Sequence, residues 1–232
     1  MEFLSTFPEC VIGISTLNDG SVDTLEHVHA LLNTVVSYPF AQIVLPKHQH
    51  ATICRQVSRL TESENMMVDG LITSDPGVVL AHRFGDCVPI VILDRRRRCL
   101  ASLHAGWRGL TQGIVAEGVL SLQAVLRSNV EDIWVWIGPC IQKNSYISRD
   151  EPLQTSLPYW KPYITQEQNG FHIDLPGFIT AQCIRLGMSE EHIISDGRDT
   201  YSQENIFYSH RRAMEANNAA SDGRFVTVAW LV

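Results

Sequence analysis

The chain has 232 residues and no linker that would favour two domains, so we expect one domain over residues 1–232. Its formal net charge of −7 argues against nucleic acid as the main partner, because phosphate backbones call for a basic surface, but it leaves room for a small anion in one local basic pocket. The chain lacks a signal-peptide pattern, CxxC pairs among its six cysteines and an apolar run of about eighteen residues, which predicts a cytoplasmic protein with reduced thiols and no membrane partner.

The first part of the chain has apolar residues at strand and helix spacing. Strands are predicted over residues 10–15, 41–46, 52–57 and 78–83, and a helix over 24–36. Asp23 is a candidate N-cap for that helix. His48 and His50 follow the 41–46 strand two residues apart, so on an extended chain both point to the same face.

Two apolar runs joined by an arginine-rich turn predict a β-hairpin in the middle of the chain. The runs cover residues 88–93 and 99–103, and the four arginines between them, 95–98, are expected to form a solvated turn. Cys87 stands at the start of the first strand and His104 at the end of the second. Because a hairpin folds those two ends together, a thiolate and an imidazole should meet at one edge of the sheet.

The rest of the chain alternates between helices and strands. A helix over residues 111–128 would place HAGWRG, residues 104–109, at a helix N-terminus, where backbone N–H groups favour anions. The further segments expected are a strand over 132–137 with a tight turn at 138–140, a loop or mobile helix over 150–169, a helix over 177–186 preceded by the segment 171–175, an extended segment over 191–195, a loop over 217–222 and a strand over 225–231. The pattern predicts a mixed α/β fold in which helices cover layered sheets.

His50, Cys87 and His104 are the leading candidates for a functional site. Two imidazoles and a thiolate match the ligand preference of zinc, and three protein ligands leave a fourth position open. Bound zinc would lower the pKa of a water in that position to about 7. The alternative is that Cys87 is a buried small hydrophobic residue and His104 a helix-cap residue.

Arg108 and Arg211 are candidates for binding an anionic substrate such as phosphate. The planar guanidinium fork makes two hydrogen bonds to phosphate oxygens, and Arg108 would add its charge to the predicted helix N-terminus. Ser209, two residues before Arg211, could give a hydroxyl to phosphate or ribose. The alternative is that these arginines form surface salt bridges.

Asp69 and Asp86 are carboxylates among apolar residues, where a charge needs partners. Asp86 stands next to Cys87, so it could orient a ligand histidine or take part in proton transfer, and it could equally cap a backbone turn. Trp107 could stack on a base or belong to the core.

FGDCVPI followed by LHAGWRG resembles the signature of the laccase-domain family, also called multicopper polyphenol oxidase-like. VDGLITSDPGVVLA, WIGPCI, FHIDL, IFYSHRR and GRFVTVAWL are similar to further blocks of that family, so that the resemblance covers about residue 40 to the end of the chain. Characterised members are reported as purine nucleoside phosphorylases with adenosine deaminase activity. The resemblance implies that His50, Cys87 and His104 bind zinc, and the family's fold is likened to that of cytotoxic necrotizing factor, a Cys–His deamidase.

The chain departs from the family pattern at several positions. The family has Gln-x-His-Gly where this chain has His48-Gln49-His50-Ala51, so His48 is an additional or alternative ligand candidate. Gln142 and Ile147 replace a glycine and a glutamate after the IGP turn, and Asp199 replaces a cysteine. The family's N-terminal arginine, which helps to hold an anionic substrate, has no assigned counterpart in the first 40 residues.

Four functions are compared. The first is a zinc-dependent purine nucleoside phosphorylase with adenosine deaminase activity, whose partners are a nucleoside and phosphate. The second is a metal-free Cys–His hydrolase or amidase, for example one that edits peptidoglycan precursors. The third is a copper polyphenol oxidase, which we expect less because nine histidines, few of them clustered, do not readily supply a blue copper site and a trinuclear centre. The fourth is an inactive family member, and a monomer and a homodimer are both open.

Overall fold

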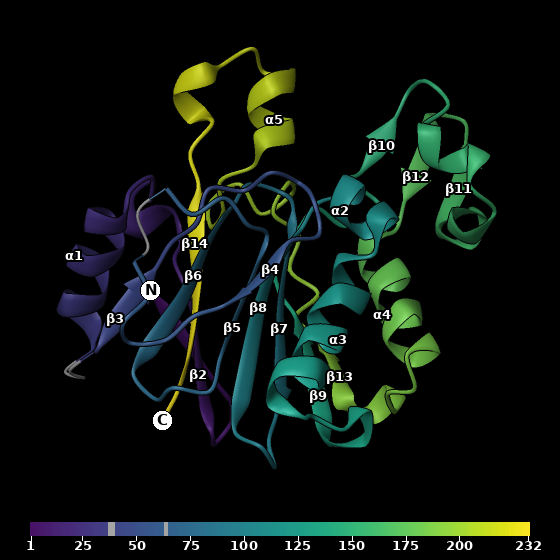
Figure 1. Ribbon diagram of the computed structural model, residues 1–232. Helices are drawn as coiled ribbons and strands as arrows, with labels where there is room; N and C mark the ends of the chain where they lie inside the picture. Colours follow the sequence, from purple (N-terminus) through teal and green to yellow (C-terminus); the bar gives the residue numbers. More distant parts are fainter. Residues whose placement is uncertain (37–39, 63–64) are drawn as a thin grey trace.

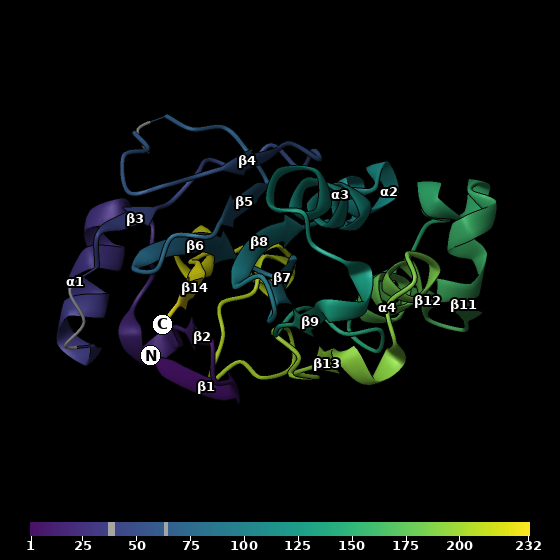
Figure 2. The same ribbon diagram turned by 60° about the horizontal axis from the view of Figure 1, so that its bottom comes forward.

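The computed structural model describes residues 1–36, 40–62 and 65–232, and these form four layers (Figure 1). Helix α1 covers one side, two β-sheets follow, and helices α3 and α4 cover the other side, an order that is also visible in the turned view of Figure 2. The expected mixed α/β fold, with helices covering layered sheets, is confirmed. No helix within the described residues is both long and apolar enough to span a membrane.

The first sheet has five strands in the order β1-β2-β14-β6-β3. Its strands are β1 (Glu2–Phe7), β2 (Cys10–Ile14), β14 (Phe225–Leu231), β6 (Val78–Phe84) and β3 (Gln42–Val44). All neighbours are antiparallel apart from β3, which runs parallel to β6. Helix α1 (Leu25–Val35) buries Val28 and Leu32 against the outer face of this sheet, as its apolar spacing predicts.

The second sheet has six strands in the order β13-β9-β7-β8-β5-β4. Its strands are β13 (Ile193–Ser195), β9 (Ile133–Ile137), β7 (Val88–Asp94), β8 (Cys99–Ala105), β5 (Gly70–Thr73) and β4 (Cys54–Gln56). Both strands of the β7–β8 hairpin are buried along their whole length, because one face packs on the first sheet and the other on helices.

Helices and a small third sheet complete the fold. The helices on the outer face of the six-stranded sheet are α2 (Trp107–Gln112), α3 (Ile114–Leu126) and α4 (Leu175–Arg185). The third sheet consists of β10 (Ile147–Ser148), β12 (Gly170–Ile173) and β11 (Ile164–Glu167). Helix α5 (His210–Glu215) leads toward β14. The short 3₁₀ turns are Leu17–Asp19, Val130–Asp132, Leu153–Ser156, Pro158–Tyr163, Glu190–His192 and Ala219–Ser221.

Three sequence-based expectations about local structure are wrong. The predicted helix over 111–128 is two helices, because Gly113 adopts a left-handed φ of 95° between α2 and α3. Thr24 caps α1 in place of Asp23, since its hydroxyl accepts a hydrogen bond from the amide of His27. The segment 150–169, predicted as a loop or a mobile helix, contains two 3₁₀ turns and the whole of β11, which the proline-dotted sequence concealed.

Candidate metal centre and active site

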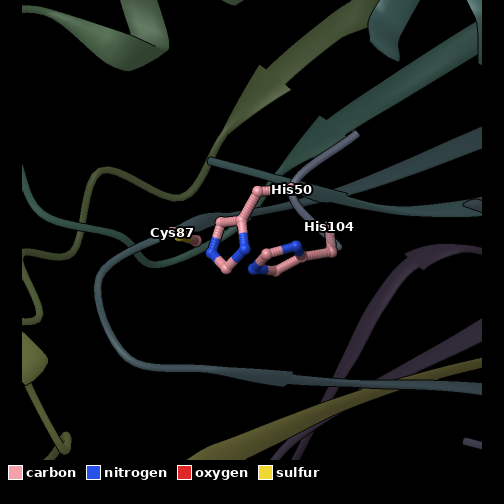
Figure 3. A group of neighbouring side chains, drawn as sticks. All are labelled: His50, Cys87 and His104. Carbon is pink, nitrogen blue, oxygen red and sulfur yellow. The ribbon is translucent and has the colours of Figure 1, made fainter. Parts of the chain in front are cut away.

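The three side chains predicted as metal ligands converge at one edge of the six-stranded sheet (Figure 3). Cys87 directly precedes β7, and His104 lies in β8, where it pairs with Pro89. His50 comes from the loop between β3 and β4. One donor atom of each residue, an imidazole nitrogen or the thiol sulfur, lies within 4.8 Å of the other two. The predicted hairpin is therefore confirmed, and its open end carries a group of side chains able to hold one metal ion.

Asp69 connects the side chain of His104 to the loop that carries His50. One of its carboxylate oxygens lies 3.0 Å from Nδ1 of His104. The same carboxylate accepts hydrogen bonds from the backbone amides of Gln49, His50 and Ala51 at 3.1, 3.0 and 2.9 Å. Because Nδ1 of His104 faces a carboxylate, it carries the hydrogen, and Nε2 keeps the lone pair that a metal needs. The partner that this charge requires is thus the metal-site histidine and its neighbouring loop.

The charge of Asp69 is maintained although the residue is fully buried. Burial raises the pKa of its carboxyl group, but the hydrogen bonds from His104 and the amide of Ala51 outweigh this effect and hold the pKa below its usual range. Burial likewise lowers the pKa of His104, and the hydrogen bond to Asp69 opposes that shift only in part. Near neutral pH the pair is therefore a carboxylate and a neutral imidazole, which is the state in which histidine binds a metal.

His50 and His48 do not lie on an extended chain, and the expectation that they share a strand face is wrong. His50 has a left-handed φ of 57°, which turns the chain between the two residues. The ring of His48 stacks on that of His104, with ring centroids 3.9 Å apart. Its Nε2 lies 2.9 Å from Nδ1 of His82, whose Nε2 donates to the carbonyl of Ser102 at 3.0 Å. The group of converging donor atoms comprises His50, Cys87 and His104, and His48 stands beside it.

Cys87 and Gly106 show how closely the ligands pack. Burial raises the pKa of the Cys87 thiol to about 12 in the absence of a metal. A Cβ atom on Gly106 would lie 3.1 Å from the sulfur of Cys87 and 3.0 Å from Cδ2 of His50. The glycine of the HAGWRG motif therefore leaves the room that the side chains of Cys87 and His50 occupy.

Asp86 holds the N-terminus of α5 in place. Its carboxylate accepts hydrogen bonds from the hydroxyls of Thr200 and Ser209 at 2.7 and 3.0 Å and from the amide of Arg211 at 2.6 Å. Ser209 is itself buried and caps α5 through the amide of Arg212. Of the roles considered for Asp86, these contacts match the capping role. Ser209 stabilises the N-terminus of α5 from a buried position.

A cavity of about 440 Å³ opens next to His50 and Cys87. Its walls are largely aromatic and apolar and include Trp107, Ile141, Tyr146, Leu175 and Met214. Both predicted anion-binding arginines reach this cavity. The exposed Arg108 lies over the ring of Trp107 at 4.5 Å. Arg211 lies over the ring of Tyr146 at 5.2 Å, and its Nη1 donates to the carbonyl of Ile147 at 2.6 Å.

Sequence reasoning missed Tyr146 and Met214, and the structure explains why. Tyr146 is carried to the cavity by the turn after Cys140, where two residues that depart from the family pattern meet. The amide of Gln142 donates to Asp199 at 3.2 Å, and the hydroxyl of Ser145 donates to the same carboxylate at 2.5 Å. A contact between positions 57 residues apart has no local sequence signal.

A second cavity, of about 570 Å³, is lined by all three candidate ligands, His50, Cys87 and His104. It shares His50, Gly85, Cys87 and His210 with the first cavity. Its other walls are polar and include Arg83 and Arg224, neither of which was singled out from the sequence. His50 and Cys87 therefore line both an aromatic cavity and a polar one, and His104 lines the polar one.

Comparisons with known proteins show which family has this layered fold and His-Cys-His group. A family model described as multi-copper polyphenol oxidoreductase laccase matches residues 13–232, and the chain belongs to this family.

Several characterised and solved proteins are similar to it. The chain is 35% identical over 150 residues to purine nucleoside phosphorylase YlmD of Geobacillus stearothermophilus, a match that covers 62% of this chain and 55% of the relative. It is 28% identical over 189 residues to a purine nucleoside phosphorylase of Xylella fastidiosa, covering 77% of this chain and 65% of the relative. The crystal structure of YlmD from Geobacillus stearothermophilus superposes with a TM-score of 0.84 at 25% identity and covers 98% of this chain and 94% of that one. The Bacillus licheniformis protein YfiH, at 22% identity and a TM-score of 0.80 over 99% of both chains, shares the fold.

Proposed function

We propose that the protein is a zinc-dependent purine nucleoside phosphorylase with adenosine deaminase activity. The observation that carries the proposal is the convergence of His50, Cys87 and His104 beside an aromatic cavity, in a chain whose relatives are named purine nucleoside phosphorylases. The free state of all six cysteines supports a reducing, cytoplasmic location.

The donor set fits zinc. Two imidazole nitrogens and one thiolate are typical zinc ligands, and three protein ligands leave a position for substrate. Asp69 supports this assignment because it fixes the tautomer of His104 and holds the loop of His50. A bound zinc ion would supply a Lewis acid at the boundary between the two cavities.

The aromatic cavity suits a purine nucleoside. Trp107 and Tyr146 offer ring faces against which a flat base can pack, and Leu175 and Met214 exclude water around it. Arg108 and Arg211 add guanidinium groups that can donate hydrogen bonds to polar atoms of the substrate. Asp86 and Ser209 contribute by positioning α5, which carries Arg211.

The proposed reaction exchanges one bond at the sugar for another. A phosphate oxygen forms a bond to C1′ of the ribose while the bond from C1′ to N9 of the purine breaks. The electron pair of that bond goes to the purine, which takes up a proton, and the products are ribose 1-phosphate and the free base. The residues of this chain bind and align the two substrates and exclude water, which otherwise competes with phosphate. In the deaminase reaction, water replaces the 6-amino group of adenosine and ammonia leaves.

The test is phosphorolysis of inosine by purified protein of known metal content. We expect hypoxanthine to form only when phosphate is present, and the rate to follow the zinc content across preparations. The variant Cys87→Ala should lose both zinc and hypoxanthine formation. Zinc-loaded wild-type protein that forms neither hypoxanthine from inosine and phosphate nor inosine from adenosine would contradict the proposal.

A second candidate is a metal-free hydrolase that uses Cys87 as nucleophile and His104 as base. The closeness of the two side chains favours it, but a thiol whose pKa burial raises to about 12 is almost entirely protonated at neutral pH and is a poor nucleophile. Rapid stoichiometric alkylation of Cys87 by iodoacetamide in zinc-loaded protein would support the hydrolase, because a thiolate bound to zinc is protected.

A copper oxidase is the third candidate, and the family description names copper. Throughout the described part of the chain, one group of three or more converging His, Cys, Asp and Glu side chains is present, the His50, Cys87 and His104 group. One such group does not supply both a blue copper site and a trinuclear centre. Copper in the purified protein together with an intense blue absorption band would support this candidate.

A further inference from the structure

The polar cavity contains an arginine whose binding capacity the protein itself leaves unused. Arg83 lies at the end of β6 and lines this cavity together with the candidate metal ligands. Its Nη1 donates to the backbone carbonyl of Asp23 at 2.6 Å. Its Nε is buried and has no hydrogen-bond partner among the described residues. Its Nη2 likewise makes no hydrogen bond among the described residues, so the guanidinium keeps a donor for a ligand in the cavity.

The charge of Arg83 is also uncompensated. Among the described residues it forms no ion pair, whereas the neighbouring Arg224 is paired with Asp222 at 2.5 Å. The same Asp222 carboxylate is shared with His210, at 3.1 Å from its Nδ1. The carboxylate is therefore occupied by two other groups, and Arg83 presents a full positive charge to the cavity.

The two cavities differ in the ligand that they can accept. The aromatic cavity offers Trp107, Tyr146 and apolar side chains, which fit a flat base. The polar cavity is lined by two arginines, two aspartates, four histidines, a glycine and Cys87, and its lining includes no tryptophan, tyrosine or aliphatic side chain. Phosphorolysis needs phosphate and nucleoside to meet at C1′ of the ribose, and the two cavities adjoin because they share His50, Gly85, Cys87 and His210.

We infer that the polar cavity is the phosphate subsite and that Arg83 is its principal anion-binding residue, with Arg224 beside it. Arg224 reaches the site because its side chain packs across Gly85, where an added Cβ would lie 3.3 Å from its Nη1. The guanidinium of Arg83 donates to phosphate oxygens through the fork that its single contact to Asp23 leaves free. This inference rests on the proposed function, and it assigns the second substrate to a cavity separate from that of Arg108 and Arg211.

The test measures binding of inorganic phosphate directly, by equilibrium dialysis of the zinc-loaded protein with ³²P-labelled phosphate. Arg83→Gln should raise the Kd for phosphate about tenfold or more, because it removes charge-assisted hydrogen bonds. Arg83→Lys keeps the charge and loses the fork, so its Kd should fall between those of wild type and Arg83→Gln. Arg97→Gln is the matched control, since Arg97 is an exposed arginine in the turn at the far end of β7 and β8, and its Kd should equal that of wild type.

Steady-state kinetics then distinguish the two cavities. Arg83→Gln should raise KM for phosphate and leave KM for inosine close to wild type, and Arg108→Gln should do the opposite. An unchanged phosphate Kd in folded Arg83→Gln, or a rise in Arg108→Gln alone, would overturn the inference. Wild-type protein that binds phosphate through Arg83 but does not cleave inosine would refute the proposed reaction and leave this subsite standing. Folded, zinc-loaded wild type that binds no phosphate would overturn the subsite.

Discussion

The two ends of the β7–β8 hairpin contain the same kinds of residue and use them differently. Each end has a cysteine at the start of a strand, Cys87 at one end and Cys99 at the other, with arginines nearby. Cys99 lies 3.1 Å from the hydroxyl of Ser128 inside the core. Cys87 faces two histidines and two cavities. Residue type therefore does not decide function here, and the deciding feature is whether the chain already supplies each side chain with a partner.

At the turn end, the arginines have partners within the protein. The guanidinium of Arg95 donates to both carboxylate oxygens of Glu9 at 3.1 to 3.3 Å and lies 5.4 Å from the ring centre of Trp134. Arg98 donates to the carbonyl of Val232. The predicted solvated turn is correct for the exposed Arg96, Arg97 and Arg98. Arg95 connects the hairpin to the turn between β1 and β2, and Arg98 connects it to the C-terminal residue. At the site end, Arg83 and the three candidate ligands keep donor and acceptor atoms for a ligand.

The largest effect is expected from removing a ligand at the site end. His104→Ala should lower the rate of inosine phosphorolysis by on the order of 100-fold or more, because metal affinity falls when one of three protein ligands is lost. His192→Ala is the control, since that ring stacks on Trp134 at 4.1 Å, away from both cavities. Hypoxanthine formation is followed by chromatography, and equal rates for the two variants would show that the site end is not the catalytic end.

The next effect concerns Asp69. Asp69→Asn should weaken zinc binding by about 10- to 100-fold, because the amide no longer fixes the tautomer of His104 or accepts all three amides of the His50 loop. The affinity is measured by competition with a chromophoric chelator. Asp69→Glu restores the charge and should recover part of the affinity. Zinc binding that does not change in Asp69→Asn would remove Asp69 from the account.

A smaller effect is expected in the aromatic cavity. Tyr146→Leu should raise KM for inosine about tenfold, because a base loses one stacking face, and leave the Kd for phosphate unchanged. Tyr159→Leu, which alters an exposed tyrosine outside both cavities, is the control. If Tyr146→Leu changes KM for phosphate and not for inosine, the assignment of the two cavities must be reversed.

The smallest effect is expected at the turn end. Arg95→Ala should cost about 0.2–1 kcal/mol of unfolding free energy, as for other exposed ion pairs, without changing activity. The hydrogen bond from Arg95 lowers the pKa of Glu9. Its stabilisation is thus present above the pKa that Glu9 has in the unfolded chain, and it is lost as the pH falls through the lower folded-state pKa. Denaturant unfolding at neutral and acidic pH should show that the unfolding free energies of wild type and Arg95→Ala become equal in acid. A difference between them that grows in acid would contradict this.

The sequence predicts the hairpin and the three candidate ligands because their signals are local or belong to recognisable motifs. Two continuous apolar runs define β7 and β8, and the turn between them brings Cys87 and His104 together. The link from Asp69 to His104 depends on the pairing of β5 with β8, which fixes the contact between residues 35 positions apart. No pattern within either segment encodes that pairing.

Other parts of the site could not be predicted because distant contacts create them. Helix α5 has six residues, too few for a helical period, and Asp86, 125 positions before Arg211, holds its N-terminus. The left-handed conformations of His50 and Asp86, with φ of 57° and 82°, are accompanied by such distant hydrogen bonds. In the sequence, Arg83 has no feature that distinguishes it from other arginines at strand ends, and only the fold places it in the wall of a cavity.

We propose that Cys87, together with His50 and His104, holds a zinc ion, while Cys99 at the other end of the hairpin does not. The most direct measurement is the metal content of wild type, Cys87→Ala and Cys99→Ala by inductively coupled plasma mass spectrometry, after purification in identical buffers. We predict one zinc ion per chain in wild type and in folded Cys99→Ala, and almost none in Cys87→Ala. Equal zinc in both variants, or a different metal in wild type, would contradict the claim.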